Sequence, residues 1–239
     1  MVLGAGRDQV PVIQKAQQMG FEAIVVSIDG DYPGFLIADK SYKIDVKNKD
    51  AVLGLAKSEG ICGIVSDQLD IAVPTVAYVA EQMGLQGIGY DCALKFTNKY
   101  KMLQGCKEIG IPVLRHFHTA TMDQAIHHSK KIDFPMVIKP VDNTGSRGVS
   151  KVNNFGELES KFKKALSHSA SGYVILEELL LGKEYAVVGF VSNYKYRNLG
   201  IGERYYFTIP DLFIPKRTLF PCLLSQYLKN KIIGIDARL

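Results

Sequence analysis

The sequence predicts an α/β protein in which a parallel sheet is followed by antiparallel sheets. Short apolar runs alternate with amphipathic helical segments over residues 1–90, which is typical of parallel strands joined by crossover helices. From residue 91 onward several β-prone runs follow one another. Two of them, FPMVIKP and GVSKV, are separated only by a small glycine-rich loop, which predicts an antiparallel hairpin.

The individual elements follow from apolar periodicity and from glycine stops. In the first segment we expect strands at 1–3, 22–29, 38–45 and 62–67, and helices at 9–20, 49–60 and 72–84. In the second segment we expect helices at 93–109, 121–132, 154–169 and from 223 onward, and strands at 111–117, 134–140, 148–152, 172–180, 182–193 and 198–207.

Composition excludes several classes of protein. Of the 239 residues, 47% are hydrophobic and 22% are charged, and no apolar run reaches the roughly 18 residues of a membrane span. The start MVLGAGRDQV lacks a basic region and a long apolar region, so we expect no signal peptide. The formal charge of +5 is spread along the chain, which argues against nucleic-acid binding. Scattered cysteines without paired spacing predict free thiols in a cytoplasmic protein: Cys62, Cys92, Cys106 and Cys222.

The turn GAGRDQ has part of a dinucleotide-binding pattern. Gly4 and Gly6 follow a predicted strand and precede a helix, but Gln9 occupies the place of the third glycine. A tight strand-to-helix turn explains the same residues. Polar residues near the ends of neighbouring strands lie where ligands gather in open α/β sheets, although ordinary loop polarity explains them equally: Asp29, Asp31, Ser66 and Asp67.

A lysine at the end of a predicted buried strand points to an anion site. Lys139 is followed by a loop that contains Gly145, Ser146 and Gly148. Glycines allow backbone N–H groups to approach phosphate oxygens, Ser146 adds a hydroxyl donor, and a lysine supplies positive charge. The pattern is not a P-loop, since no Gly-Lys-Ser/Thr leads into a helix. The alternative is a solvated hairpin loop with a lysine reaching into water.

Further along the chain, an acidic segment has the features of a nucleotide linker. In the run VILEELLLGKEYAVV, Glu177 and Glu178 are followed by three consecutive leucines, a glycine turn and Glu184. An apolar linker with accessible backbone groups can bind an adenine edge, and a carboxylate is a good acceptor for ribose hydroxyls. The alternative is that these glutamates are acidic residues of an edge strand, which are common.

Taken together, these residues resemble the ATP-grasp superfamily of carboxylate–amine and carboxylate–thiol ligases, over nearly the whole chain. That superfamily includes biotin carboxylase, the carbamoyl phosphate synthase large subunit and D-alanine–D-alanine ligase. FPMVIKPVDNTGSRGVSKV is similar to its lysine strand and glycine-rich loop, and ILEELLLGKEYAVV is similar to its adenine linker and ribose-binding acid. The resemblance is closest to members labelled carbamoyl-phosphate-synthase-like.

The resemblance implies which residues contact the phosphates. Lys99, early in the helix expected at 93–109, and Lys139 would both contact them. The loop that closes on the phosphates would comprise Gly145, Ser146, Gly148 and Val149.

It also implies the contacts to the nucleoside. Glu177 and Glu178 would lie at the adenine amino group and the linker, Leu180 would offer backbone contacts to the ring, and Glu184 would hold the ribose. ATP would then lie between two antiparallel sheets.

The implied domains are a pre-ATP-grasp domain at 1–90, the ATP-grasp N-terminal lobe at 91–173, and the start of the C-terminal lobe at 174–239. ATP and Mg²⁺ are the implied cofactors. The magnesium ligands are expected beyond Leu239, so we expect a chain that is truncated within its second lobe, and we assign no catalytic residue.

Three functions follow as hypotheses. The first is a full-length ATP-dependent ligase that joins a small carboxylate to an amine through an acyl phosphate. The second is a nucleotide-binding module without catalytic activity, and the third is a dinucleotide-binding protein that uses Gly4 and Gly6. The expected partners are ATP, a small carboxylate and a second copy in a homodimer, with neither nucleic acid nor membrane among them.

Overall fold

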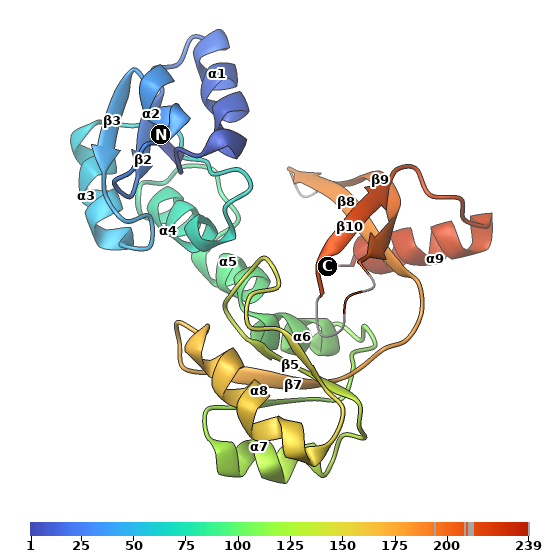
Figure 1. Ribbon diagram of the computed structural model, residues 1–239. Helices are drawn as coiled ribbons and strands as arrows, with labels where there is room; N and C mark the ends of the chain where they lie inside the picture. Colours follow the sequence, from blue (N-terminus) through green and yellow to red (C-terminus); the bar gives the residue numbers. More distant parts are fainter. Residues whose placement is uncertain (194, 208, 210–212, 239) are drawn as a thin grey trace. The chain divides into compact units, whose positions relative to one another are not determined.

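The computed structural model describes residues 1–193, 195–207, 209 and 213–238. The chain divides into two compact units, Met1–Lys101 and Met102–Leu239 (Figure 1). A parallel sheet in the first unit is followed by antiparallel sheets in the second, which confirms the predicted fold class.

The first unit is built around a small parallel sheet with helices on both faces. Its central strand, β2 (Ile24–Ser27), is buried along its whole length. Ile24 and Val26 pack in one core cluster and Val25 in another, as expected for the alternating side chains of a strand. The remaining elements are β1 (Val2–Leu3), β3 (Lys40–Lys43), α1 (Val10–Gln18), α2 (Pro33–Ile37), α3 (Lys49–Ser58) and α4 (Val73–Gln82).

The strand expected at 62–67 is reduced to a single bridge, so that prediction was wrong in extent. Val65 pairs in parallel with Val2, and two backbone hydrogen bonds join it to Met1 and Leu3. Because β1 is only two residues long, it leaves no further backbone groups for a longer ladder.

The helix expected at 93–109 is two helices, α5 (Tyr90–Thr97) and α6 (Lys99–Glu108). Asn98 between them has extended backbone angles, φ −115° and ψ 115°. Its side-chain oxygen accepts hydrogen bonds from the N–H groups of Tyr100 and Lys101, both at 3.1 Å. An asparagine that caps a new helix in this way ends the preceding one.

The second unit begins with a four-stranded antiparallel sheet in the order β4-β7-β5-β6. Helices α7 (Met122–Ser129) and α8 (Phe155–Ser167) cover one face, and both lie on the same side of β5 and β7 in Figure 1. The predicted hairpin is confirmed, because β5 and β6 pair with Met136 opposite Val152. The strands are β4 (His116–Thr119), β5 (Met136–Pro140), β6 (Ser150–Val152) and β7 (Val174–Glu178).

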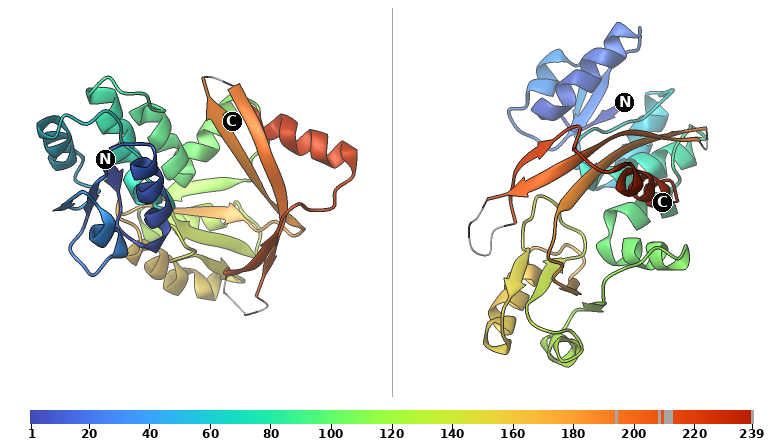
Figure 2. Two further views of the ribbon diagram at one scale, coloured as in Figure 1. Left: turned by 90° about the horizontal axis from the view of Figure 1, so that it is seen from above. Right: turned by 90° about the vertical axis from the view of Figure 1, so that its right-hand side faces the viewer.

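A second antiparallel sheet follows in the order β10-β9-β8. Its strands are β8 (Glu184–Ser192), β9 (Lys195–Tyr206) and β10 (Pro215–Leu219), and the long β8–β9 hairpin stands out in orange in Figure 2. The last helix, α9 (Gln226–Asp236), begins after Ser225, whose side chain caps the Leu228 N–H.

All four cysteines lie among the described residues and none of them forms a disulfide. Nowhere in the described residues does a helix combine the length and the apolar character needed to cross a bilayer.

Candidate functional site

The four-stranded sheet has one face packed on α7 and α8, and we refer to the opposite side as the open face. Strand alternation and register assign the side chains to the two faces. Met136, Ile138 and Leu176 belong to the helix-covered core. The strand register therefore aligns a row of residues on the open face, one from each strand: His116, Glu177, Val137 and Lys151.

Lys139 also lies on the open face, where it forms an ion pair with Glu177. The Lys139 Nζ to Glu177 Oε2 distance is 2.6 Å, and the two side chains are 22% and 7% exposed. Lys139 pairs in register with Ile175, so Glu177 is its diagonal neighbour two residues along β7. This pairing holds the lysine at the end of β5, where the glycine-rich loop begins.

The base of that loop is anchored to the turn between α8 and β7. The Asp142 carboxylate accepts hydrogen bonds from the Ser169 hydroxyl and from the N–H groups of Ala170 and Ser171. The Asn143 amide donates to the His168 carbonyl at 2.7 Å. The base of the loop is therefore fixed by side chains rather than by strand pairing.

Gly148, at the end of the loop, is also part of this base. It has φ +77°, and a Cβ there would lie 2.8 Å from the Pro140 ring and 2.8 Å from His168 Cβ. Only glycine combines that backbone angle with so close an approach.

The tip of the loop presents backbone donors. Gly145 and Ser146 have φ +65° and +57°. Among the described residues, the N–H groups of Gly145, Ser146 and Gly148 have no hydrogen-bond acceptor. The N–H of Val149 donates within the loop, to the Ser146 carbonyl, and the Ser146 hydroxyl donates to the Phe213 carbonyl at 2.5 Å. Backbone donors gathered in this way form an anion-binding arrangement.

Asp142→Asn is expected to destabilise the chain in a pH-dependent way. Burial alone would raise the pKa of Asp142, but the hydrogen bonds from Ser171, Ser169 and Ala170 outweigh it and lower that pKa below 3.8. A lowered pKa contributes stability above the unfolded value, and the contribution is lost as pH falls through the folded value. Urea unfolding of both proteins should show the wild type more stable at about pH 7, with the difference shrinking below about pH 4. A difference that stays constant with pH would contradict this role of the carboxylate.

The two adjacent glutamates of β7 have different partners, because successive side chains of a strand point to opposite faces. Glu177 is paired with Lys139, whereas Glu178 forms an ion pair with Arg115 and also accepts the Arg115 N–H at 3.0 Å. These bonds lower the pKa of Glu178. Beyond Glu178, Leu180 and Leu181 of the connection to β8 are 70% and 88% exposed.

Glu184 begins β8 and lies opposite Arg204 of β9. One carboxylate oxygen accepts from Arg204 Nη1 at 2.9 Å and the other accepts from the Tyr206 hydroxyl at 2.7 Å. Burial, followed by the hydrogen bond to Glu184, raises the pKa of Tyr206. A carboxylate has about four acceptor positions, so about two of those of Glu184 are not used by these contacts.

The remaining predicted residue, Lys99, is the first residue of α6 and belongs to the first unit, whereas the other predicted residues belong to the second. Lys151 and His116, which sequence reasoning missed, share the open face with Lys139. In β6 Ser150 and Val152 are buried and Lys151 between them is not. This alternation is the signal that places Lys151 on the open face.

Comparisons with known proteins agree with this fold. The family model described as "D-ala D-ala ligase C-terminus" matches residues 106–207. The formate-dependent phosphoribosylglycinamide formyltransferase of Wolinella succinogenes is 28% identical over 183 residues, which are 75% of this chain and 47% of that relative. A crystal structure of an L-amino acid ligase from Bacillus licheniformis matches with a TM-score of 0.82 at 18% identity, over 99% of this chain and 58% of the other.

The chain has the ATP-grasp fold. Another solved structure with this fold is the biotin carboxylase domain dimer of the 2-oxoglutarate carboxylase from Hydrogenobacter thermophilus, in complex with MgADP, ADP and bicarbonate. It matches with a TM-score of 0.79 at 18% identity, over 99% of this chain and 56% of the other. This ATP-grasp chain spans about half the length of the curated relatives it matches.

The residues of this ATP-grasp chain suit a nucleotide better than a metal ion. Phosphate oxygens could be bound by Lys139 and by the loop N–H groups that have no acceptor among the described residues. Ribose hydroxyls could donate to the acceptor positions of Glu184 that its other contacts do not use. Within the described ranges, no three histidine, cysteine or acidic side chains are grouped so that they could hold a metal ion.

Proposed function

We propose that this chain binds ATP at the open face of its four-stranded sheet and serves an ATP-dependent ligation of a carboxylate to an amine. The observation that carries the proposal is the position of Lys139. This cation is held by a buried glutamate, beside a loop in which the N–H groups of Gly145, Ser146 and Gly148 lack acceptors among the described residues. The ATP-grasp fold and the similarity to ligases of that fold support the same assignment.

In the proposed reaction a carboxylate oxygen attacks the γ-phosphorus of ATP, and ADP leaves. The amine nitrogen then attacks the acyl carbon of the acyl phosphate, phosphate departs, and the nitrogen loses a proton. Lys139 and the amides of Gly145, Ser146 and Gly148 bind and orient the phosphates, and Lys139 offsets their charge. Positioning and charge neutralisation account for most of the catalysis in such transfers.

The nucleoside contacts are proposed for the linker and β8. Leu180 and its neighbours offer backbone groups and apolar contact to the adenine ring, and Glu184 accepts the ribose hydroxyls. Glu177 is proposed to accept the adenine amino group when the phosphates draw Lys139 away from it. The ion pair of Glu178 with Arg115 supports a different role for that residue, as an anchor of the linker.

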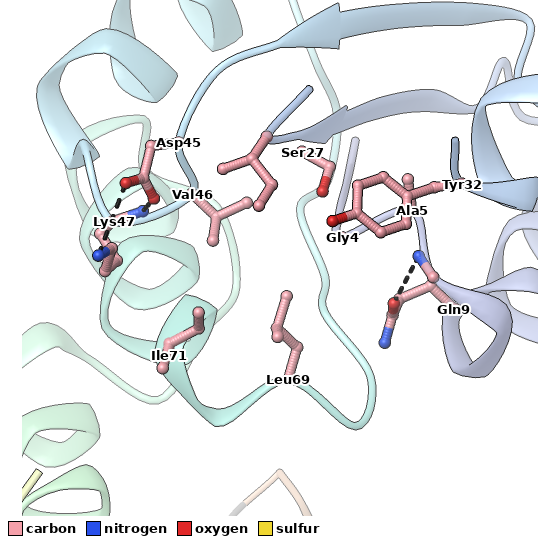
Figure 3. Close-up of a pocket in the computed structure, with 12 residues that line it drawn as sticks. Gly4, Ala5, Gln9, Ser27, Tyr32, Asp45, Val46, Lys47, Leu69 and Ile71 are labelled. Atoms are coloured by element: carbon pink, nitrogen blue, oxygen red, sulfur yellow. Dashed lines mark hydrogen bonds and ion pairs between the residues drawn. The ribbon is translucent and has the colours of Figure 1, made fainter. Parts of the chain in front are cut away.

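The dinucleotide hypothesis is disfavoured by the contacts of Gln9. The Gly6 N–H, which a pyrophosphate would need, donates to Gln9 Oε1 at 3.0 Å (Figure 3). The Gln9 amide in turn donates to the Asp67 carbonyl at 2.5 Å, and the side chain is buried. An anion at this turn would have to displace a buried and hydrogen-bonded glutamine.

Calorimetric titration with ATP tests the proposal. The informative variant is the double substitution Lys139→Met/Glu177→Gln, because it removes the cation without leaving a buried carboxylate unpaired. We expect ATP affinity to fall at least tenfold, about 1.4 kcal/mol. The matched control, Lys163→Met/Glu159→Gln, removes an exposed lysine–glutamate pair from α8 and should bind ATP as the wild type does.

Equal ATP affinity in the wild type and the Lys139→Met/Glu177→Gln variant would overturn the proposed site, and tighter binding of NAD⁺ than of ATP would favour the dinucleotide hypothesis. ATP binding without ADP release, measured with Mg²⁺ and candidate carboxylates present, would support the non-catalytic binding module. Gel filtration of the same samples tests the homodimer.

A further inference from the structure

Arg115 joins three segments of the chain at the start of the proposed nucleotide linker. It directly precedes β4, and its guanidinium group forms an ion pair with Glu178, the last residue of β7. The same group donates to the Lys131 carbonyl at 3.3 Å and lies 3.4 Å from the Asp133 carboxylate. Both of these residues belong to the connection between α7 and β5. Arg115 therefore ties this connection to the point where the chain leaves β7.

Backbone hydrogen bonds reinforce the contact between Arg115 and Glu178. The Arg115 N–H donates to the Glu178 carboxylate at 3.0 Å, and the Glu178 N–H donates to the Arg115 carbonyl at 3.1 Å. The two residues thus extend the pairing of β4 with β7 by one step beyond His116 and Glu177. The end of β7 is therefore held through its backbone and through its last side chain.

The linker that follows, residues 179–183, has no such support of its own. In the part of the chain that the structure describes, no hydrogen bond holds the backbone of these five residues. Leu180 and Leu181 are 70% and 88% exposed. A segment without internal hydrogen bonds is positioned by its two ends, which here are Glu178 at the end of β7 and Glu184 at the start of β8.

From these contacts we infer that Arg115 is a positioning residue of the proposed ATP site, which orders the start of the linker through Glu178 so that the linker backbone can meet an adenine ring. The inference rests on the proposed function. Glu178 points to the face of the sheet opposite that of Glu177, so Arg115 acts on the linker and not on the nucleotide. A linker that is already ordered loses less conformational freedom when it binds, which raises affinity.

Calorimetric titration of Arg115→Met with ATP tests the inference. Arg115 and Glu178 are 56% and 28% exposed, so the loss of their ion pair should leave the fold intact, which thermal melts check. We expect ATP affinity to fall about three- to tenfold, because binding must then order the linker. Glu178→Gln should also weaken binding, and Arg115→Met/Glu178→Gln should bind no more weakly than Arg115→Met, because both changes remove the same contact. Lys163→Met is the matched control, since it removes an exposed cation of α8 and should leave the affinity unchanged.

Spectra without nucleotide distinguish a positioning role from a general structural one. In ¹H–¹⁵N correlation spectra of the full chain, Arg115→Met should shift the amide signals of Leu180 and Leu181. The signals of Gly145 and Gly148, in the glycine-rich loop, should stay at their wild-type positions. A general disturbance of the sheet would move both groups of signals.

Wild-type ATP affinity in folded Arg115→Met would overturn the inference. Additive losses in Arg115→Met/Glu178→Gln, or equal shifts of the linker and loop signals, would overturn it too. In each of these cases the proposed ATP site stands if Lys139→Met/Glu177→Gln still loses affinity. If the wild type binds no ATP, or if Lys139→Met/Glu177→Gln binds it as the wild type does, the proposed function fails and this inference fails with it.

Discussion

Lys139→Met is expected to lower the free energy of unfolding by about 2–3 kcal/mol, because it leaves the Glu177 carboxylate buried without its partner. Removing one member of a fully buried pair typically costs about 3–5 kcal/mol, and the lower figure here reflects the partial exposure of Lys139. Glu177 is 7% exposed and its oxygen lies 2.6 Å from the Lys139 ammonium. Urea unfolding of the purified variant measures the change.

A second pair in the chain serves as the control. Lys163 and Glu159 also lie 2.6 Å apart, but their side chains are 71% and 64% exposed on α8. Lys163→Met should therefore cost no more than about 0.5 kcal/mol. Adding Glu177→Gln to Lys139→Met should restore at least half of the lost stability. If the double variant is as unstable as Lys139→Met alone, the loss does not come from the unpaired carboxylate.

Gly148→Ala is expected to lower the free energy of unfolding by about 2–4 kcal/mol. The backbone angle of φ +77° disfavours any residue with a Cβ by about 1–2 kcal/mol. The added methyl group would also meet Pro140 and His168 at 2.8 Å, and such overpacking costs about 1–3 kcal/mol. Denaturant unfolding with an unchanged m-value would assign the loss to the folded state.

Gly145→Ala separates the two contributions. Gly145 has a similar angle, φ +65°, but a Cβ there would meet no atom within 4 Å. This variant should therefore lose only about 1–2 kcal/mol. Equal losses at the two glycines would show that contact with Pro140 and His168 does not restrict position 148.

The sequence was sufficient to predict that a parallel sheet precedes antiparallel sheets, because both kinds of sheet have local sequence patterns. Apolar runs spaced by amphipathic helices indicate crossovers, and the β5–β6 hairpin follows from two β-prone runs around a glycine loop. The break at Asn98 was missed because apolar spacing continues across it, so the periodicity of α5 and α6 merges. The strand at 62–67 was overestimated because strand length depends on the partner, and β1 offers only two residues.

The candidate site was predictable as a set of residues but not as a set of contacts. The types and order of Lys139, the loop glycines and the later glutamates can be read from the sequence. The pairing of Lys139 with Glu177 depends on the register of two strands far apart in the chain. The partners of Glu184 depend likewise on the β8–β9 register, which places Arg204 opposite it.

The opposite orientations of Glu177 and Glu178 have a consequence for the evolution of this chain. Although the two neighbours are identical in type, each belongs to a different pair: position 177 with position 139, and position 178 with position 115. We therefore expect substitutions at these two positions to depend on their partners elsewhere in the chain rather than on each other. A charge change at position 178 is expected to require a compensating change at 115, and a charge change at 177 a compensating change at 139.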